Sequence, residues 1–360
     1  MAIEKVNGVE NTEQPQGVQV PLPEVDITPG VTEMDDGSAI IGEMQQEIQA
    51  TVPVPFDANL AEFIDDNDLG VISSDIVADI DEDISSRRDW EDQYKGGLEL
   101  LGMNYEDRAE PFEGASGVVH PLLAESVTQF QAQAYREMLP ASGPVRTHIV
   151  GAENPELLAQ AERVKNYMNY QITYEMEEYD PELDQMLFYL PIVGSAFKKI
   201  YFDPSMQRAV SKFVHAEDLI VPYNATDLKT STRITHVVRM DKNEIRKLQL
   251  QGFYKDIDLP SSDSGGTNYD EVKETIDDIQ GVSKGSSYNE EITLYEIHTD
   301  LDLIGFEDIG QDGQPTGLKM PYVVTIVEKS GEILSIKRNF NESDPFRRKI
   351  PYFVHYKFLP

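Results

Sequence analysis

The chain has 360 residues, no cysteine, and 65 acidic against 30 basic side chains, which gives a net charge of −35. The absence of cysteine excludes disulfides, zinc–thiolate sites and thiol catalysis, and the acidic balance opposes DNA binding through the grooves because it repels phosphate. No apolar run approaches the ~20 residues that span a bilayer, so we expect no membrane partner.

Residues 1–70 are predicted to form an acidic, disordered tail. The first 86 residues contain 20 Asp and Glu but a single basic residue, Lys5. The apolar residues of the first 70 recur with neither a helical nor a strand period, which is typical of segments that cannot bury a core. Two interpretations are open: a solvated tail, or a segment that becomes ordered only on a partner or a neighbouring subunit.

Residues 71–195 are predicted to form the helical part of the folded domain. Apolar residues recur at steps of three or four over Ile76–Leu101, and Gly96-Gly97 interrupts this pattern. A second apolar stripe lies between Pro121 and Pro140, because proline suits the first turn of a helix and ends one elsewhere.

The strongest helix signal follows Asn154. This residue can accept a hydrogen bond as the N-cap, Pro155 suits the first turn, and Glu156 favours the positive end of the helix dipole. One face of this predicted helix is apolar down to Glu178, and its members are Leu157, Ala161, Val164, Met168, Ile172 and Met176. We expect one more helix over residues 181–190, with Asp180 as its cap.

Residues 196–360 are predicted to form a β-rich part, because the apolar period changes from helical to two-fold after Gly194. Expected strands cover residues 196–202, 209–214, 234–240, 291–301, 322–328 and 332–337. Asp241 and Glu244 form a capping box that begins a short helix before Gly252. Helices followed by a mostly antiparallel β region predict an α+β fold. The final segment PYFVHYKFLP favours a truncated fragment of a longer protein, with a natural C-terminal strand as the alternative.

No set of residues predicts catalysis, a cofactor site or a metal site. The six histidines lack the spacing of metal ligands, and each is expected to be a lone strand or cap residue. The stretch Asp79–Asp83 is followed by Ile84 where a calcium loop needs glycine, and Gly114-Ala-Ser116-Gly is one residue short of a nucleophile elbow. We therefore expect a protein that is not an enzyme, with a hydrolase built on a carboxylate pair as a minor alternative.

The basic pairs and triplets are scattered along the chain. They are Arg87-Arg88, Lys198-Lys199 and Arg347-Arg348-Lys349. Because side chains alternate along a strand, Lys198 and Lys199 are expected on opposite faces. We interpret these residues as rim salt bridges rather than as a nucleic-acid patch.

Several short signatures occur in a fixed order between Ser86 and Pro222. They are Trp90–Tyr94 with Gly97-Leu98, Pro111-Phe112-x-Gly114-Ala115-Ser116, His120-Pro121, Pro140-x-x-Gly143-Pro144-Val145, Asp184–Leu187, Gly194–Lys199, Ala216–Leu219 and Val221-Pro222. In these residues the chain resembles the portal proteins (head–tail connectors) of tailed bacteriophages, in particular the large portals of short-tailed phages. The resemblance covers residues 86–260 well and continues more weakly to Pro360. None of these signatures is a catalytic fingerprint, so their order and number carry the resemblance.

The resemblance implies a structural subunit of a ring of about twelve copies at one capsid vertex. Such a ring has a channel for double-stranded DNA, which passes through without sequence-specific binding. The implied partners are the terminase and the capsid, scaffold and tail adaptor proteins, and the implied location is the virion, after assembly in the host cytoplasm. The helices and strands resemble the wing of a portal, so the stem and clip are expected beyond Pro360.

Four aromatic residues are the candidate subunit-interface anchors: Trp90, Tyr94, Tyr105 and Phe112. Aromatic side chains dominate the binding energy of protein interfaces, which is why we select them. The alternative for Trp90 and Tyr94 is that they fill the core of their own subunit. An alternative function for the whole chain is a phage structural adaptor or scaffold-interaction protein that binds through the acidic N-terminal tail.

Overall fold

The computed structural model divides the chain into two compact units, Met1–Val54 and Pro55–Pro360. It describes residues 31–33, 39–41, 54–101, 112, 120–152, 154–204, 206–259, 276, 291–310 and 314–359. In the first unit, strands β1 (Val31–Glu33) and β2 (Ala39–Ile41) pair antiparallel. The disorder that we predict for the rest of residues 1–53 lies outside the described residues.

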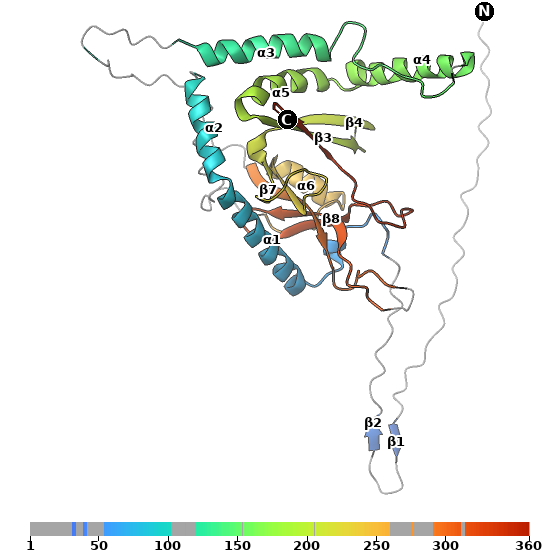
Figure 1. Ribbon diagram of the computed structural model, residues 1–360. Helices are drawn as coiled ribbons and strands as arrows, with labels where there is room; N and C mark the ends of the chain where they lie inside the picture. Colours follow the sequence, from blue (N-terminus) through green and yellow to red (C-terminus); the bar gives the residue numbers. More distant parts are fainter. Residues whose placement is uncertain are drawn as a thin grey trace, which may run out of the picture. The chain divides into compact units, whose positions relative to one another are not determined.

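Most helices of the second unit precede its strands in the sequence (Figure 1). After the short 3-10 helix η1 (Leu60–Glu62), the α-helices are α1 (Asp66–Ser86), α2 (Arg88–Leu100), α3 (Leu122–Met138), α4 (Pro155–Tyr170), α5 (Tyr179–Val193) and α6 (Lys242–Leu250). Helix α4 continues directly into a short π-helix, η2 (Gln171–Glu175), and a further 3-10 turn, η3 (Ala216–Asp218), follows the first strands of this unit.

The strands of the second unit form two antiparallel sheets. The first has the order β10-β3-β4 and consists of β3 (Ser195–Asp203), β4 (Arg208–Val214) and β10 (Phe353–Lys357). The second has the order β5-β6-β7-β8-β9 and consists of β5 (Leu219–Ile220), β6 (Arg233–Asp241), β7 (Glu291–Leu301), β8 (Met320–Val327) and β9 (Ile333–Arg338). The predicted α+β fold class is confirmed. We did not predict strand β5, because a strand of two residues is too short to show the alternation of apolar and polar residues.

Helix α5 lies between helix α3 and the three-stranded sheet (Figure 1). Its buried face follows steps of three and four residues, and the core there consists of Leu183, Met186, Leu187, Leu190 and Ala196. Phe130 and Tyr135 of α3 pack against this core from the other side. Gly194 ends α5 with a positive φ of 83°, which lets the chain turn directly into β3.

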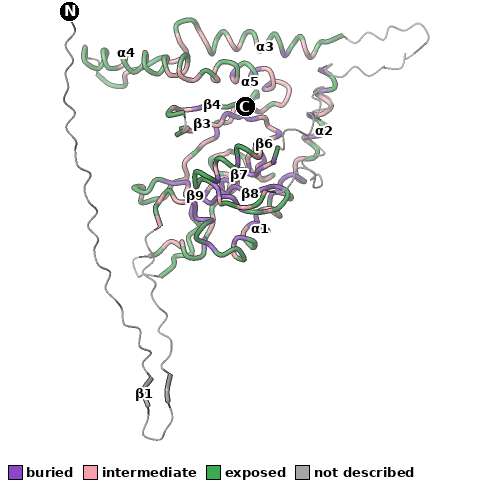
Figure 2. The backbone as a smooth tube through the Cα atoms, turned by 180° about the vertical axis from the view of Figure 1, so that it is seen from behind, coloured by how far each residue is buried: buried purple, intermediate pink, exposed green. Residues whose placement is uncertain are grey.

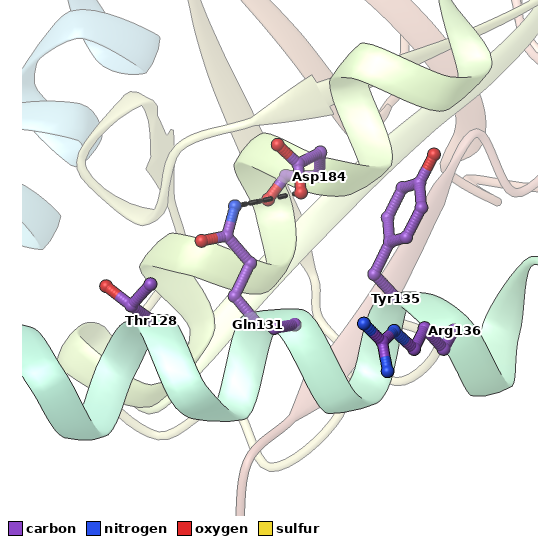
Figure 3. Close-up of a pocket in the computed structure, with 6 residues that line it drawn as sticks. Thr128, Gln131, Tyr135, Arg136 and Asp184 are labelled. Carbon is purple, nitrogen blue, oxygen red and sulfur yellow. Dashed lines mark hydrogen bonds between the residues drawn. The ribbon is translucent and has the colours of Figure 1, made fainter.

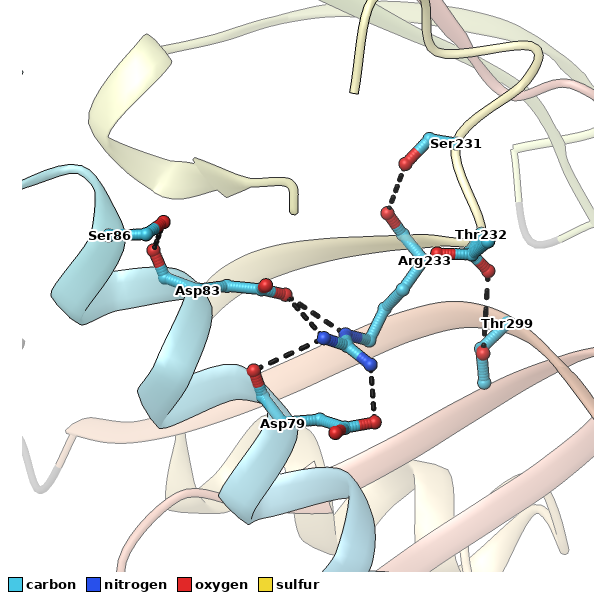
Figure 4. A network of polar contacts seen from close by, with 7 residues as sticks. All are labelled: Asp79, Asp83, Ser86, Ser231, Thr232, Arg233 and Thr299. Carbon is cyan, nitrogen blue, oxygen red and sulfur yellow. Dashed lines mark hydrogen bonds and ion pairs between the residues drawn. The ribbon is translucent and has the colours of Figure 1, made fainter. Parts of the chain in front are cut away.

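Helix α1 is joined to the five-stranded sheet by an ion-pair network (Figure 4). Arg233 of β6 donates from Nε and Nη2 to Oδ2 of Asp83, at 3.0 and 2.8 Å, and also pairs with Asp79. Asp83 is only 5% exposed, so the guanidinium compensates a carboxylate that has lost its water. The other buried residues of α1 are Ser73 and four apolar ones: Leu69, Ile76, Ile80 and Ile84.

The folded unit begins earlier than we predicted. Asn59 donates from Nδ2 to the carbonyl of Leu334 at 2.9 Å and accepts from the amide of Ile336 at 3.0 Å. These bonds occupy backbone groups of β9, which is an edge of the five-stranded sheet. Leu60 and Ala61 are fully buried beside them. The predicted disordered tail over residues 1–70 is therefore wrong for residues 55–70, where a few buried apolar side chains order an acidic segment.

The three predicted helix caps have different outcomes. Helix α6 begins directly after Asp241 as predicted, but the capping box is wrong, because Asp241 makes no side-chain capping hydrogen bond. Asn154 caps α4 as predicted, since its Oδ1 accepts from the amide of Leu157 at 2.7 Å. Asp180 does not cap α5, because that helix begins at Tyr179. The Asp180 carboxylate instead accepts a hydrogen bond of 2.5 Å from the hydroxyl of Tyr135, and it thereby links α5 to α3.

Candidate assembly interface

Helix α4 exposes the apolar face that we predict from its sequence. None of its 16 residues is buried. Leu157, Val164 and Met168 of the predicted apolar face are 40%, 44% and 41% exposed, and the neighbouring Leu158 is 50% exposed. In Figure 2 this helix is green and pink, whereas strands β7 and β8 are largely purple. A helix that packed on its own domain would bury such a face, so α4 presents apolar surface that the described part of the chain leaves uncovered.

Three tyrosines add an aromatic row to α4 and the π-helix that follows it. Tyr167, Tyr170 and Tyr174 are 59%, 50% and 73% exposed. The rings of Tyr170 and Tyr174 stack with centroids 5.7 Å apart and planes inclined by 22°. Tyrosine combines a large apolar ring with a hydroxyl donor and loses little entropy when it is fixed, and it is enriched at protein interfaces for this reason.

The loop before α4 is fixed to this helix by Asn169. The amide of Val145 donates to Oδ1 of Asn169 at 2.9 Å, and Nδ2 of Asn169 donates back to the carbonyl of Val145 at 3.2 Å. Gly143 lies against the same side chain with a φ of 92°, and a Cβ atom there would be 2.6 Å from Cγ of Asn169. Glycine is therefore required at position 143 by both its backbone angle and its contact.

A shallow hollow of about 330 Å³ lies between α3 and α5 (Figure 3). Gln131 of α3 closes one side by donating from Nε2 to Oδ1 of Asp184 at 2.8 Å. Thr128, Tyr135 and Arg136 complete its labelled lining. The hollow offers one guanidinium, that of Arg136, and one carboxylate that is already hydrogen-bonded, that of Asp184.

Of the predicted interface anchors, Trp90 and Tyr94 lie within their own subunit. Their rings stack with centroids 5.6 Å apart, and Tyr94 is only 4% exposed beside Leu98. Burial, together with the carboxylate of Glu217, raises the pKa of the Tyr94 hydroxyl. Arg87 donates to the carbonyl of the same Glu217 at 2.8 Å, so α2 is attached to η3. The structure therefore supports the alternative that Tyr94 fills the core of its own subunit.

The other two predicted anchors have separate outcomes. Tyr105 lies outside the described residues. Phe112 is 70% exposed, so it stays a candidate for contact with another molecule. The exposed aromatic row of α4 was not among the predicted anchors, although Tyr167, Tyr170 and Tyr174 recur at helical spacing in a helix that the sequence does predict.

A charged cluster lies between the two sheets. Lys199 of β3 donates from Nζ to both carboxylate oxygens of Glu296 on β7, at 2.6 and 2.7 Å. The Nε2 atom of His298 is 2.9 Å from Glu296 Oε1, and His236 of β6 pairs with Glu296 in the strand register. Burial would raise the pKa of Glu296, but Lys199 and His298 outweigh it and hold the pKa well below its usual range. Burial lowers the pKa of His236 to about 4.

Lys198, the neighbour of Lys199, faces the other way and is also buried. It is 1% exposed, and its ammonium lies 4.0 Å from the ring centroid of Tyr179. Burial lowers the pKa of Lys198 to about 8. The predicted alternation of the two lysines is confirmed, but their interpretation as rim salt bridges is wrong, since β3 is the central strand of its sheet, Lys198 is buried, and the side chain of Lys199 is only 14% exposed.

Within the described part of the chain, no group of three or more His, Asp or Glu side chains is placed to hold a metal ion. Among the helices that the structure describes, none has the length and apolarity that crossing a membrane requires. Neither the protein-family models nor the curated proteins include a match to this chain. The geometry of the exposed α4 surface is thus the main guide to function.

Proposed function

We propose that the chain is a structural subunit of a phage portal ring at the capsid vertex, which forms the channel for DNA packaging and ejection and docks the terminase and the tail. In this role the subunit has no enzymatic activity and associates with copies of itself. The observation that carries the proposal is the exposed apolar and aromatic face of α4 and η2, which ordinary folding of a single subunit leaves uncovered.

The signatures that resemble portal proteins support this reading through their contacts. Tyr94 is held beside Glu217, which belongs to the signature Ala216–Leu219. The side chain of Asn169 leaves no room for a Cβ atom at Gly143, and Gly194 joins α5 to β3. These residues therefore fix the positions of the helices within the subunit, including the helix that exposes the apolar face.

The charge of the chain sets a requirement that the α4 face can meet. A net charge of −35 on each copy makes identical subunits repel one another. Stable interfaces overcome such costs through apolar burial, with about 1,600 Å² as a standard total area. The leucines, methionine and tyrosines of α4 are apolar surface of the kind that is needed, and salt screens the repulsion that remains.

Electron microscopy of the purified chain at micromolar concentration tests the proposal. We expect rings with a central hole, and light scattering is expected to give the mass of a closed oligomer of about twelve copies. A stable monomer under these conditions would contradict the proposed function.

A matched pair of variants connects this assembly to α4. Val164→Asp places a charge on the exposed face of the helix and is expected to abolish rings while the circular dichroism spectrum stays unchanged. Leu250→Asp places the same charge on α6, where Leu250 is 73% exposed, and is expected to leave the rings intact. Equal assembly of the two variants would exclude α4 as the interface.

A further inference from the structure

The charges of the second unit are unevenly distributed between its helices. Residues 54–101, which contain α1 and α2, have 14 acidic and three basic side chains, a net charge of −11. Residues 120–176, which contain α3, α4 and η2, have six acidic and four basic side chains, a net charge of −2. A contact of the second region of one copy with the first region of another therefore keeps two strongly acidic surfaces from meeting each other.

The aromatic row of α4 begins with a positive charge. Arg163 precedes Tyr167, Tyr170 and Tyr174 at intervals of four, three and four residues, which place all four on one side of a helix. Arg163 is exposed and has no carboxylate partner among the described residues. The row therefore presents three hydroxyl donors and a guanidinium, and each of these groups favours a carboxylate acceptor.

The outer face of α1 has a matching arrangement. Ser74, Ala78, Asp81 and Ser85 are exposed and follow the same intervals of four, three and four residues. Their side chains are short, so aromatic rings can approach the helix closely. The exposed carboxylates of Asp75 and Glu82 flank this row. The opposite face of α1 is the one that packs into its own subunit.

We propose that the row Arg163, Tyr167, Tyr170 and Tyr174 of one copy docks along the outer face of α1 in a second copy. Each row spans 12 residues, whose 11 steps extend about 16 Å at the rise of an α-helix, so the two are similar in length. The tyrosine rings cover the short side chains of α1, while their hydroxyls and Arg163 reach the carboxylates beside them. A contact between two different helices can repeat head to tail from copy to copy as a heterologous interface, which forms a ring where its rotation closes. This inference rests on the proposed function and names the surfaces that serve it.

Disulfide crosslinking tests the contact directly, because the chain has no cysteine of its own. Ala78→Cys and Tyr170→Cys are made as separate variants, one with an added affinity tag so that mixed dimers are recognised by size. Both positions are exposed, so neither variant is expected to impair folding. After mild oxidation of an equal mixture we expect the mixed dimer of 78 with 170 to be the main product. The matched control mixes Tyr170→Cys with Leu250→Cys and is expected to give no such product.

The other outcomes separate this inference from the proposed function. Rings without the mixed dimer overturn the docking of α4 on α1 and leave the portal proposal in place. Crosslinks only between two copies of Tyr170→Cys indicate a symmetric α4–α4 contact and also overturn the inference. Monomers without any crosslink contradict both proposals.

Charge reversal gives a second measurement of the same contact. Arg163→Glu is expected to lower the yield of the mixed dimer about twofold to fivefold, as for the loss of an exposed ion pair. Adding Asp81→Lys to the α1 partner is expected to restore the yield. A yield that Arg163→Glu does not change would exclude this residue from the contact.

Discussion

Helix α4 and strand β7 differ in what surrounds their side chains. On β7, Glu296 and His298 are enclosed between two sheets, and each has a partner within hydrogen-bond distance in the same copy. On α4, Val164 and Tyr167 are exposed, and the described chain supplies no cover for them. The first region is therefore expected to determine whether the chain folds. The second is expected to determine what the folded chain binds.

The largest effect is expected from removing the positive charge of the buried cluster. Lys199→Ala leaves the carboxylate of Glu296, whose side chain is 23% exposed, without its ammonium partner. This is expected to lower the free energy of unfolding by about 3 kcal/mol, the lower end of the range for a buried pair. Urea denaturation followed by circular dichroism measures this. Lys212→Ala is the matched control, because Lys212 lies opposite Lys199 on β4 but is exposed, and it is expected to change stability by less than about 0.5 kcal/mol. Similar values for the two variants would show that the cluster is unimportant for folding.

The second effect is a loss of stability in mild acid. Burial lowers the pKa of His236 from its ordinary value of 6.5 to about 4, so this residue binds a proton more weakly in the folded chain than in the unfolded chain. Its contribution is fully present above about pH 6.5 and is lost as the pH falls towards about 4, for a total of about 3 kcal/mol. Between about pH 7 and pH 5 we expect a loss of about 2 kcal/mol.

The variant His236→Gln isolates this contribution. Burial also lowers the pKa of His298, so that residue adds a loss of the same sign in both proteins. Urea titrations of the two proteins at several pH values should therefore diverge at neutral pH and approach one another in acid. Parallel stability curves across this range would mean that His236 does not titrate between folded and unfolded states as its burial implies.

The sequence predicts local features of both regions and misses their long-range contacts. The Asn154 cap and the strand β7 depend on neighbours in the chain, and each was predicted correctly. Glu296 and His298 share a face of β7 because strands alternate with a period of two, which the sequence also contains. Lys199, however, is 97 residues from Glu296 and belongs to another sheet, so no local pattern could pair them.

At the candidate interface, too, the sequence predicts a local pattern but not which element covers it. An apolar helical stripe ordinarily indicates a buried face, and the stripe of α4 is exposed because no other element of the described chain packs on it. Conversely, Tyr94 was selected as an anchor although Glu217, more than a hundred residues later, contributes to its enclosure. Periodicity identifies an apolar face, whereas the element that covers this face depends on tertiary structure.

A smaller effect is expected at the edge of the five-stranded sheet. Asn59→Ala leaves the carbonyl of Leu334 and the amide of Ile336 without the side chain that bonds them, which is expected to cost about 1–3 kcal/mol. The control Asn67→Ala removes an exposed amide nearby and is expected to cost less than about 0.5 kcal/mol. Thermal unfolding distinguishes the two.

Removal of residues 1–53 extends this test to the acidic tail. Because the second unit begins at Pro55, we expect its unfolding to be unchanged by this truncation. If ring formation is retained as well, self-association does not depend on the tail. Loss of partner binding with intact rings would instead assign the tail to a partner, which is the role that the adaptor alternative gives it.

The smallest effect on stability is expected from a substitution on α4. Its size decides whether α4 differs from the buried regions as we propose. Met168→Ala and Met186→Ala remove the same atoms, but Met168 is 41% exposed on α4 and Met186 is fully buried on α5. Met186→Ala is expected to cost about 2–5 kcal/mol, because it leaves a cavity in a packed core. Met168→Ala is expected to cost less than about 0.5 kcal/mol in the separated subunit and to weaken the association of copies. Dilute samples give the first quantity by urea denaturation, and light scattering across concentrations gives the second. A cost near that of Met186→Ala in the monomer would mean that α4 is covered within its own copy, and the distinction between a folding region and a binding region would no longer hold.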